Sequence, residues 1–326
     1  MGKFFLTFAA LILYNLNGRG RRPALPRTVP GAKSKKMNYD IEELRDKIKT
    51  IANLPTLPHI ASRLMRIVNS PSASADTVAA LVSQDISLSA KVLRLANSAF
   101  YGIPRSVNTL NNAVIILGFK IIQTMVLSLT VFDMFAEKDD KKPAPFDRDA
   151  FWEHSLRCAV IARLLAHKRK RNYALDPEEA FCAGLLHDIG KVVMEQYLNT
   201  DFHKALYHAR ANGIPIFEAE KEVLGYTHCD VASWLTGTWS LPDEIEQPMI
   251  CHHEPEEAVI CADAVLICHI ANIMSKIDTE NEAAAEEAVR ELEPKAKQLG
   301  LYARDLSDVI AELPGEMERS SMFIKK

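Results

Sequence analysis

The sequence predicts an all-α protein. Apolar residues recur at spacings of three and four, no stretch sustains an alternation of apolar and polar residues, and capping residues and prolines separate the periodic segments. The composition is that of an ordinary globular chain, with 48% apolar and 25% charged residues among 326. A chain of this length can bury a large core and fits two packed helical subdomains.

The first 36 residues differ from the rest of the chain. Residues 4–13 form an apolar run, but a helix needs about 20 residues to cross a bilayer. The segment after it, up to Lys36, is rich in Arg, Pro and Lys and is predicted to be disordered. Residues 1–36 are therefore either a weak anchor or an over-extended start that is not translated. We favour the second interpretation, because Met37 leads straight into a helical pattern, and we predict no stable membrane span.

Charge and cysteine usage narrow the class of protein. Eight of the 39 Lys and Arg residues lie in residues 1–36, so the remaining 31 face 42 acidic residues, a net charge of −11. A body this acidic excludes broad nucleic-acid binding through a basic face. The six cysteines form no CxxC pair and predict reduced thiols and a cytoplasmic location. A thiolate ligand at Cys229 or Cys251 stays open, although a carboxylate-containing site favours harder cations.

Residues 37–140 are predicted to form an N-terminal helical subdomain. Apolar faces indicate helices that begin near Tyr39, Ile60 and Ser74, and a further helix over 88–96. Asp85 stands at the junction before that last helix, where its side chain can cap the helix. The long apolar stretch 110–132 is interrupted at Gly118.

Residues 136–149 are charged and contain prolines, so they are predicted to be a linker or exposed loop. Helical periodicity then resumes at Phe151, and Asp176-Pro177 is a typical helix start. We predict a second subdomain over 150–275 and C-terminal helices within 276–326. The further helices expected there cover 201–212, 215–224, 228–237, 243–253, 257–275, 282–299 and 303–313.

The stretch Ala183–Lys191 carries the strongest chemical signal. It ends an apolar helical run with the adjacent side chains of His187 and Asp188, followed by Gly190 and Lys191. An ionisable pair among apolar residues must be hydrogen-bonded, paired or bound to a metal, because an unpaired buried charge is very costly. A neutral imidazole beside a carboxylate is a good start for a divalent metal site.

Two sets of motifs follow one another in order along residues 45–275. The first consists of Leu54-Pro55-Thr56-Leu57-Pro58, Val82-Ser83-Gln84-Asp85, Leu93–Ser98 with Tyr101-Gly102, and Ala113–Gly118. The second consists of Glu153-His154-Ser155, Ala183–Lys191, Gly225-Tyr226-Thr227-His228, Trp239-Ser240-Leu241-Pro242 and His252-His253-Glu254-Pro255. In this order the motifs resemble the HDOD family, the HD-related output domains of bacterial signalling proteins.

The resemblance implies an N-terminal helical subdomain packed on a degenerate HD phosphohydrolase core. In HD phosphohydrolases the matching positions hold one or two divalent metals, and imidazoles with a carboxylate suit Fe, Mn, Zn or Ni. Lys191 can contact a phosphate, or it can be a solvated lysine near a helix end. The metal ligands expected here are His154, His187, Asp188, His228, His252 and His253. We expect all six side chains to converge in one helical hollow.

Two departures from the HD enzymes argue against catalysis. Asn272 stands where those enzymes carry a further aspartate, so it is a doubtful ligand, and no glycine loop follows His253. We therefore expect a signal-transduction module that acts through contacts with signalling proteins, with Asp85 and residues 97–102 as the region to test. The alternative role of that region is helix capping and turn formation. The alternative function is a metal-dependent phosphohydrolase or phosphodiesterase with a nucleotide ligand, and a third option is a structural adaptor with an empty pocket.

Overall fold

The computed structural model describes residues 56–68, 70, 73–135, 145–169, 175–279 and 281–323. Across these residues the regular structure is helical, with no strand, so the all-α prediction is confirmed. The leader 1–36 and the helix predicted from Tyr39 lie outside the described residues, as does most of the predicted linker. The boundaries of the subdomains stay predictions.

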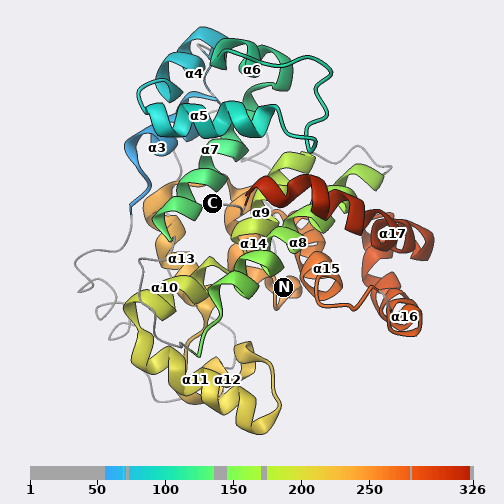
Figure 1. Ribbon diagram of the computed structural model, residues 1–326. Coiled ribbons are helices and arrows are strands. Elements are labelled where there is room, and N and C mark those ends of the chain that lie inside the picture. Colours follow the sequence, from blue (N-terminus) through green and yellow to red (C-terminus); the bar gives the residue numbers. More distant parts are fainter. Residues whose placement is uncertain are drawn as a thin grey trace, which may run out of the picture. The chain divides into compact units, whose positions relative to one another are not determined.

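Residues 56–135 form a group of helices that Figure 1 shows in blue and green at one end of the ribbon. Its members are α3 (His59–Ile67), α4 (Ala75–Val82), α5 (Ile86–Ala96), α6 (Leu110–Leu117) and α7 (Phe119–Met134). The side chains of Ser74 and Asp85 cap α4 and α5 by accepting backbone N–H bonds. Gly118, at φ 86°, separates α6 from α7, and the two helices are bent by 119°. Both the caps and the break agree with the sequence prediction.

The remaining helices build the body that carries the second set of motifs. They are α8 (Arg148–Lys168), α9 (Pro177–Leu186), α10 (Ile189–Tyr197), α11 (Asn199–Asn212), α12 (Ile216–Leu224), α13 (His228–Trp239), α14 (Asp243–Cys251), α15 (Ala262–Met274), α16 (Glu282–Gln298) and α17 (Ala303–Ser320). Helices α8, α9, α14 and α15 pack on one another, α10 packs on α13, and α7 joins the N-terminal group to α9. Short 3₁₀ turns at Pro255–Glu257 and Ser321–Phe323 complete the described chain.

Capping explains where the helices next to the predicted metal ligands begin. Asp176 and Glu179 form a capping box at the start of α9, with Pro177 in its first turn. Thr227 and Asp230 form a second capping box that starts α13 at His228. The chain before α13 turns through Gly225, which has φ 74°. These local signals set the register of two helices that bear site residues.

Two predicted helix boundaries are wrong. The helix expected over 257–275 begins only at Ala262, because Glu254–Glu257 turn as a 3₁₀ segment and Cys261 adopts φ 52°. The helix expected to end at Leu313 continues through Pro314 to Ser320. Packing of α17 against α8 outweighs the hydrogen bond that the proline removes.

Within the described ranges, no single helix is long and apolar enough to cross a membrane. The bent pair α6 and α7 meets the length and composition criteria only when the two helices are taken together.

Gly190 fixes the distance between α10 and α13. A Cβ atom placed on Gly190 would lie 2.0 Å from the carbonyl oxygen of His228, a contact that no side chain tolerates. The backbone of α10 therefore approaches the first residue of α13 as closely as it does because residue 190 has no side chain. This approach holds His228 near the His187-Asp188 pair.

We expect Gly190→Ala to lower the free energy of unfolding by about 1–3 kcal/mol or more, because the backbone of α13 must move. Urea unfolding followed by circular dichroism measures this change. Gly237→Ala in α13 is the matched control, because nothing lies within 4 Å of its added Cβ. That control should raise stability by about 0.5–1 kcal/mol. Equal stability of the two variants would contradict the close approach at Gly190.

Candidate metal centre

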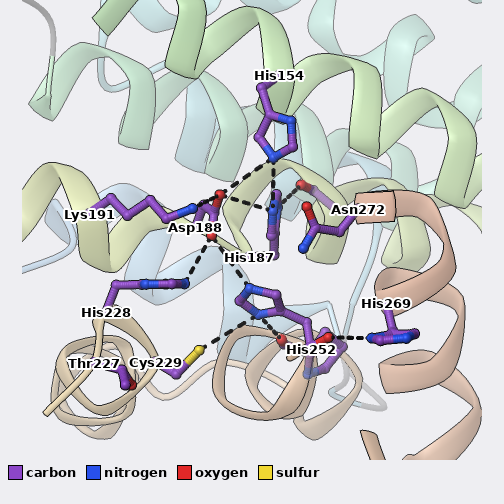
Figure 2. A network of polar contacts seen from close by, with 12 residues as sticks. His154, His187, Asp188, Lys191, Thr227, His228, Cys229, His252, His269 and Asn272 are labelled. Atoms are coloured by element: carbon purple, nitrogen blue, oxygen red, sulfur yellow. Dashed lines mark hydrogen bonds and ion pairs between the residues drawn. The ribbon is translucent and has the colours of Figure 1, made fainter. Parts of the chain in front are cut away.

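The predicted ligands come from separate elements and meet around Asp188 (Figure 2). His154 projects from the middle of α8, and the pair His187-Asp188 fills the break between α9 and α10. His228 is the first residue of α13, and His252 follows the last residue of α14. Asp188 is only 1% exposed, and His187, His228 and His252 are fully buried. Five of the six side chains that we expected to converge therefore lie together around Asp188, whereas His253 is set apart from the carboxylate.

Each oxygen of Asp188 faces a different pair of imidazoles. Oδ2 lies 3.4 Å from Nε2 of His154 and 3.2 Å from Nε2 of His187, and these two nitrogens are 3.3 Å apart. Oδ1 lies 3.2 Å from Nε2 of His228 and 3.4 Å from Nε2 of His252. The carboxylate thus lies between two pairs of ring nitrogens.

The second nitrogen of each of these rings is held by an acceptor outside the cluster. Nδ1 lies against Ser275 Oγ for His154 (3.1 Å), the Gly184 carbonyl for His187 (2.7 Å), Glu220 Oε2 for His228 (2.6 Å) and the Pro248 carbonyl for His252 (2.9 Å). Carbonyl and carboxylate oxygens can only accept hydrogen bonds. The Ser275 hydroxyl donates to the Asn272 carbonyl, so it too accepts from His154. All four Nδ1 atoms therefore carry a proton.

This arrangement leaves four Nε2 lone pairs directed at a carboxylate whenever the rings are neutral. Asp188 Oδ1, His228 Nε2 and His252 Nε2 are buried and make no hydrogen bond. Oδ1 nevertheless lies only 3.2 Å from the His228 nitrogen and 3.4 Å from the His252 nitrogen. Lone pairs at such distances repel unless positive charge lies among them. The ammonium group of Lys191 supplies such charge at Oδ2 only, so further charge has to come from protons on the imidazoles or from a bound cation.

The pKa shifts show which imidazoles carry the positive charge in the metal-free protein. Burial lowers the pKa of His187, but the charges of Asp188 and Cys158 and their hydrogen bonds together outweigh burial and raise it to about 10. Burial likewise lowers the pKa of His228, yet Glu220 leads a net rise well above the ordinary value. For His252 burial dominates and lowers the pKa to about 4. Burial raises the pKa of Asp188, but His187 and Lys191 hold it well below its usual range.

The distances also fit a metal ion. Ligand atoms that sit about 2.0–2.2 Å from one ion lie roughly 3.0–3.4 Å from each other at adjacent positions. The triangle formed by His154 Nε2, His187 Nε2 and Asp188 Oδ2 has sides of 3.3, 3.2 and 3.4 Å. Its three residues, and separately His228, Cys229, His252 and His253, form groups that could hold a metal. The residues present therefore fit a divalent cation, without identifying which one.

The other three predicted residues lie at the edge of this cluster. His253 stacks on Phe217, with ring centroids 4.1 Å apart, and its buried Nε2 has no hydrogen-bond partner. Asn272 is 4% exposed on α15, and its Oδ1 also has none. Lys191 donates to Asp188 Oδ2 at 2.5 Å, so its ammonium group neutralises the carboxylate in this structure.

Sequence reasoning missed Glu220, which lies on α12 and is fully buried. Its Oε2 accepts hydrogen bonds from both the backbone N–H and Nδ1 of His228. A signal for it was present, because Phe217 and Leu224, three residues before and four after, place residue 220 on an apolar helical face. Ser275, the acceptor for His154, carried no comparable signal.

The region proposed for partner contacts has structural roles in the described protein. The Asp85 side chain caps α5 by accepting from the Leu88 backbone. The Asn97 amide donates to the carbonyls of Leu93 and Val107 and accepts from the Val107 backbone, which closes the loop after α5. Phe100 is buried. Capping and loop closure, the alternative for this region, account for these residues.

Comparisons with known proteins agree with this fold. A structure of an HDOD domain protein with unknown function from Geobacter sulfurreducens is 27% identical, with a TM-score of 0.69, over 87% of this chain and 98% of that one. A candidate phosphohydrolase from Shewanella amazonensis SB2B is 26% identical, with a TM-score of 0.62, over 85% of this chain and 96% of that one.

A curated relative, an uncharacterized protein of Treponema pallidum (strain Nichols), is 26% identical over 211 residues. The match covers 64% of this chain but only 40% of the relative, so the chain spans less than half of that protein's length. The HDOD domain itself matches residues 54–255, which is more than half of the 326 residues. The chain therefore belongs to the HDOD family.

Proposed function

We propose that this chain is a signal-transduction regulatory module that binds divalent metal in its HD-type pocket and acts through contacts with signalling proteins. The observation that carries the metal-binding part is the set of four imidazoles whose Nδ1 atoms are all engaged elsewhere, so that four Nε2 atoms face Asp188. Metal-binding histidines have this arrangement, with one nitrogen free and the other held by an acceptor.

The ligands that we propose are His154, His187, Asp188, His228 and His252, with His253 as a further donor. Nitrogen donors with one carboxylate suit Fe, Mn, Zn or Ni. His154 and His187 with one Asp188 oxygen, and His228 and His252 with the other, are the residues that would hold one or two ions. A bound ion would supply Lewis-acid activation of water or of a phosphoryl group.

Two features support regulation over catalysis. Asn272 offers a neutral amide where HD enzymes have a carboxylate, which removes negative charge that would hold a metal. The chain after the histidine doublet turns at once into the 3₁₀ segment Pro255–Glu257, and residues 254–259 contain no glycine. The pocket therefore keeps ligands for a cation but has lost features of a substrate site, as suits a module whose output is a protein contact.

A second candidate function is that of a metal-dependent phosphohydrolase acting on a nucleotide. The position of Lys191 favours it, because its ammonium group lies 2.5 Å from Asp188 and could contact a phosphate beside the metal. The Shewanella amazonensis relative, which is named as a candidate phosphohydrolase, also supports it. Turnover separates this candidate from the regulatory module.

We expect protein purified without chelator to hold at least about one Fe, Mn, Zn or Ni ion per chain by elemental analysis, and to hydrolyse no nucleotide in a substrate screen. Asp188→Asn keeps the shape of the side chain but loses its charge, so it should lose most of the metal. Asp133→Asn, at an exposed surface pair with Lys91, is the matched control and should retain it. Metal-free wild-type protein after supplementation would contradict the proposal, and turnover that Asp188→Asn abolishes would establish the second candidate.

Metal binding should also release protons. In the metal-free protein His187, with a pKa of about 10, carries a proton at neutral pH that a metal on Nε2 must displace. Raising the pH weakens this competition, so the affinity for Zn²⁺ should rise up to about tenfold per pH unit for each displaced proton between about pH 6 and 8. Calorimetry in buffers of different ionisation enthalpy counts the released protons. Binding without proton release would show that His187 is neutral beforehand.

A further inference from the structure

Helix α12 buries a carboxylate beside the candidate metal centre. Its buried side chains are Phe217, Ala219, Glu220 and Leu224, and Glu220 is 0% exposed. A buried carboxylate is costly unless hydrogen bonds compensate it. Its Oε2 accepts two hydrogen bonds from His228, at 2.9 Å from the backbone N–H and 2.6 Å from Nδ1, while Oε1 has no hydrogen-bond partner. The polar contacts of Glu220 are thus directed to one candidate metal ligand.

The contact with Glu220 determines which ring nitrogen of His228 faces Asp188. A carboxylate accepts hydrogen bonds and cannot donate them, so Nδ1 of His228 carries the proton and Nε2 is the nitrogen at 3.2 Å from Asp188 Oδ1. If the ring held its only proton on Nε2, Nδ1 and Glu220 would face each other as two acceptors. Glu220 therefore selects the tautomer that can bind a metal at Nε2.

Two neighbouring positions of α12 contact the histidine doublet and the turn after it. Phe217 stacks on His253, with 15° between the ring planes. Lys221 donates to Glu254 Oε1 at 2.6 Å, and its Nζ lies 4.1 Å from the centre of the Phe217 ring. Residues 217, 220 and 221 share one helical face. One face of α12 therefore contacts His228, His253 and Glu254 together.

Helix α12 pairs with α11 in a hairpin over residues 199–224, which Figure 1 shows in yellow at the end of the ribbon opposite α4 and α6. Helix α11 packs on α10, which follows Asp188 directly. The hairpin thus contacts α10 through α11, and His228 and His253 through α12. The stacked ring of Phe217 and the buried carboxylate of Glu220 are the contacts that link His253 and His228 to α12.

From these contacts we infer that Glu220 is a positioning residue for the metal ligand His228 and that α12 couples occupancy of the site to the hairpin 199–224. The inference rests on the proposed metal binding. If a cation is bound at Nε2, the His228 ring would be held in place, its Nδ1–H bond to Glu220 would be strengthened, and α12 would be held more firmly against the body. The structural consequence of metal binding that this inference predicts is tighter packing of residues 216–224 against the pocket.

The test compares Glu220→Ala, Glu220→Gln and Glu222→Gln with the wild type. Glu222 lies on the same helix and is exposed, pairing with His208, so Glu222→Gln is the matched control. Binding of Zn²⁺ alone is measured by calorimetry. We expect Glu220→Ala to weaken binding about 10–100-fold, which is the usual effect of losing such a partner. Glu220→Gln should recover part of the loss, because its amide oxygen still accepts from Nδ1, and Glu222→Gln should bind as the wild type does.

Hydrogen exchange of residues 216–224 gives the second readout. Zn²⁺ should slow amide exchange there in the wild type and in Glu222→Gln, but not in Glu220→Ala. Circular dichroism and the metal-free unfolding temperature establish that each variant is folded, and Glu220→Gln decides the question if Glu220→Ala is not.

Three results would overturn the inference: wild-type affinity in Glu220→Ala, a loss in Glu220→Gln as large as in Glu220→Ala, or unchanged exchange in the metal-loaded wild type. In all three the wild type still binds Zn²⁺, and the proposed function stands. Absence of binding in the wild type would instead overturn the proposed function, and this inference with it.

Discussion

Asp188 is a carboxylate that the fold has removed from water and surrounded with imidazole nitrogens. At 1% exposure it cannot rely on solvent, and Lys191 contacts only one of its oxygens. The four Nε2 atoms at 3.2–3.4 Å need positive charge among them, whether from protons or from a cation. The packing of α8, α9, α13 and α14 around Asp188 is stable only if that positive charge is supplied.

The same constraint explains why two of the proposed ligands, His187 and His252, stand at the C-terminal ends of helices. His187 caps the carbonyl of Gly184 in the last turn of α9, and His252 caps that of Pro248 in the last turn of α14. The Pro248 carbonyl also accepts the backbone N–H of His252, so each imidazole adds a hydrogen bond to a backbone carbonyl while its own tautomer is fixed. The negative ends of the two helix dipoles also favour positive charge in the pocket. The hydrogen bonds at the ends of these two helices therefore also orient the two imidazoles toward Asp188.

The sequence predicted the helical class, most helix positions and the ligands that meet at Asp188, because amphipathic spacing and ordered motifs are local signals. The start of α15 was wrong because the φ of 52° at Cys261 depends on its surroundings. The end of α17 was wrong because Pro314 normally stops a helix, whereas packing on α8 prolongs this one. Glu220 was missed because its role depends on the hairpin that brings α12 to His228. Each of these features depends on contacts between segments far apart in the sequence, which local sequence patterns do not predict.

The central claim is that a cation, and not protons alone, occupies the space around Asp188 in the working protein. The most direct measurement is anomalous X-ray diffraction from crystals of metal-supplemented protein, with data collected on both sides of the metal absorption edge. The account predicts an anomalous peak about 2.0–2.2 Å from an Asp188 oxygen and from at least two of the facing Nε2 atoms. Absence of any peak beside Asp188 in such crystals would contradict it and leave the imidazoles as a proton-bridged core.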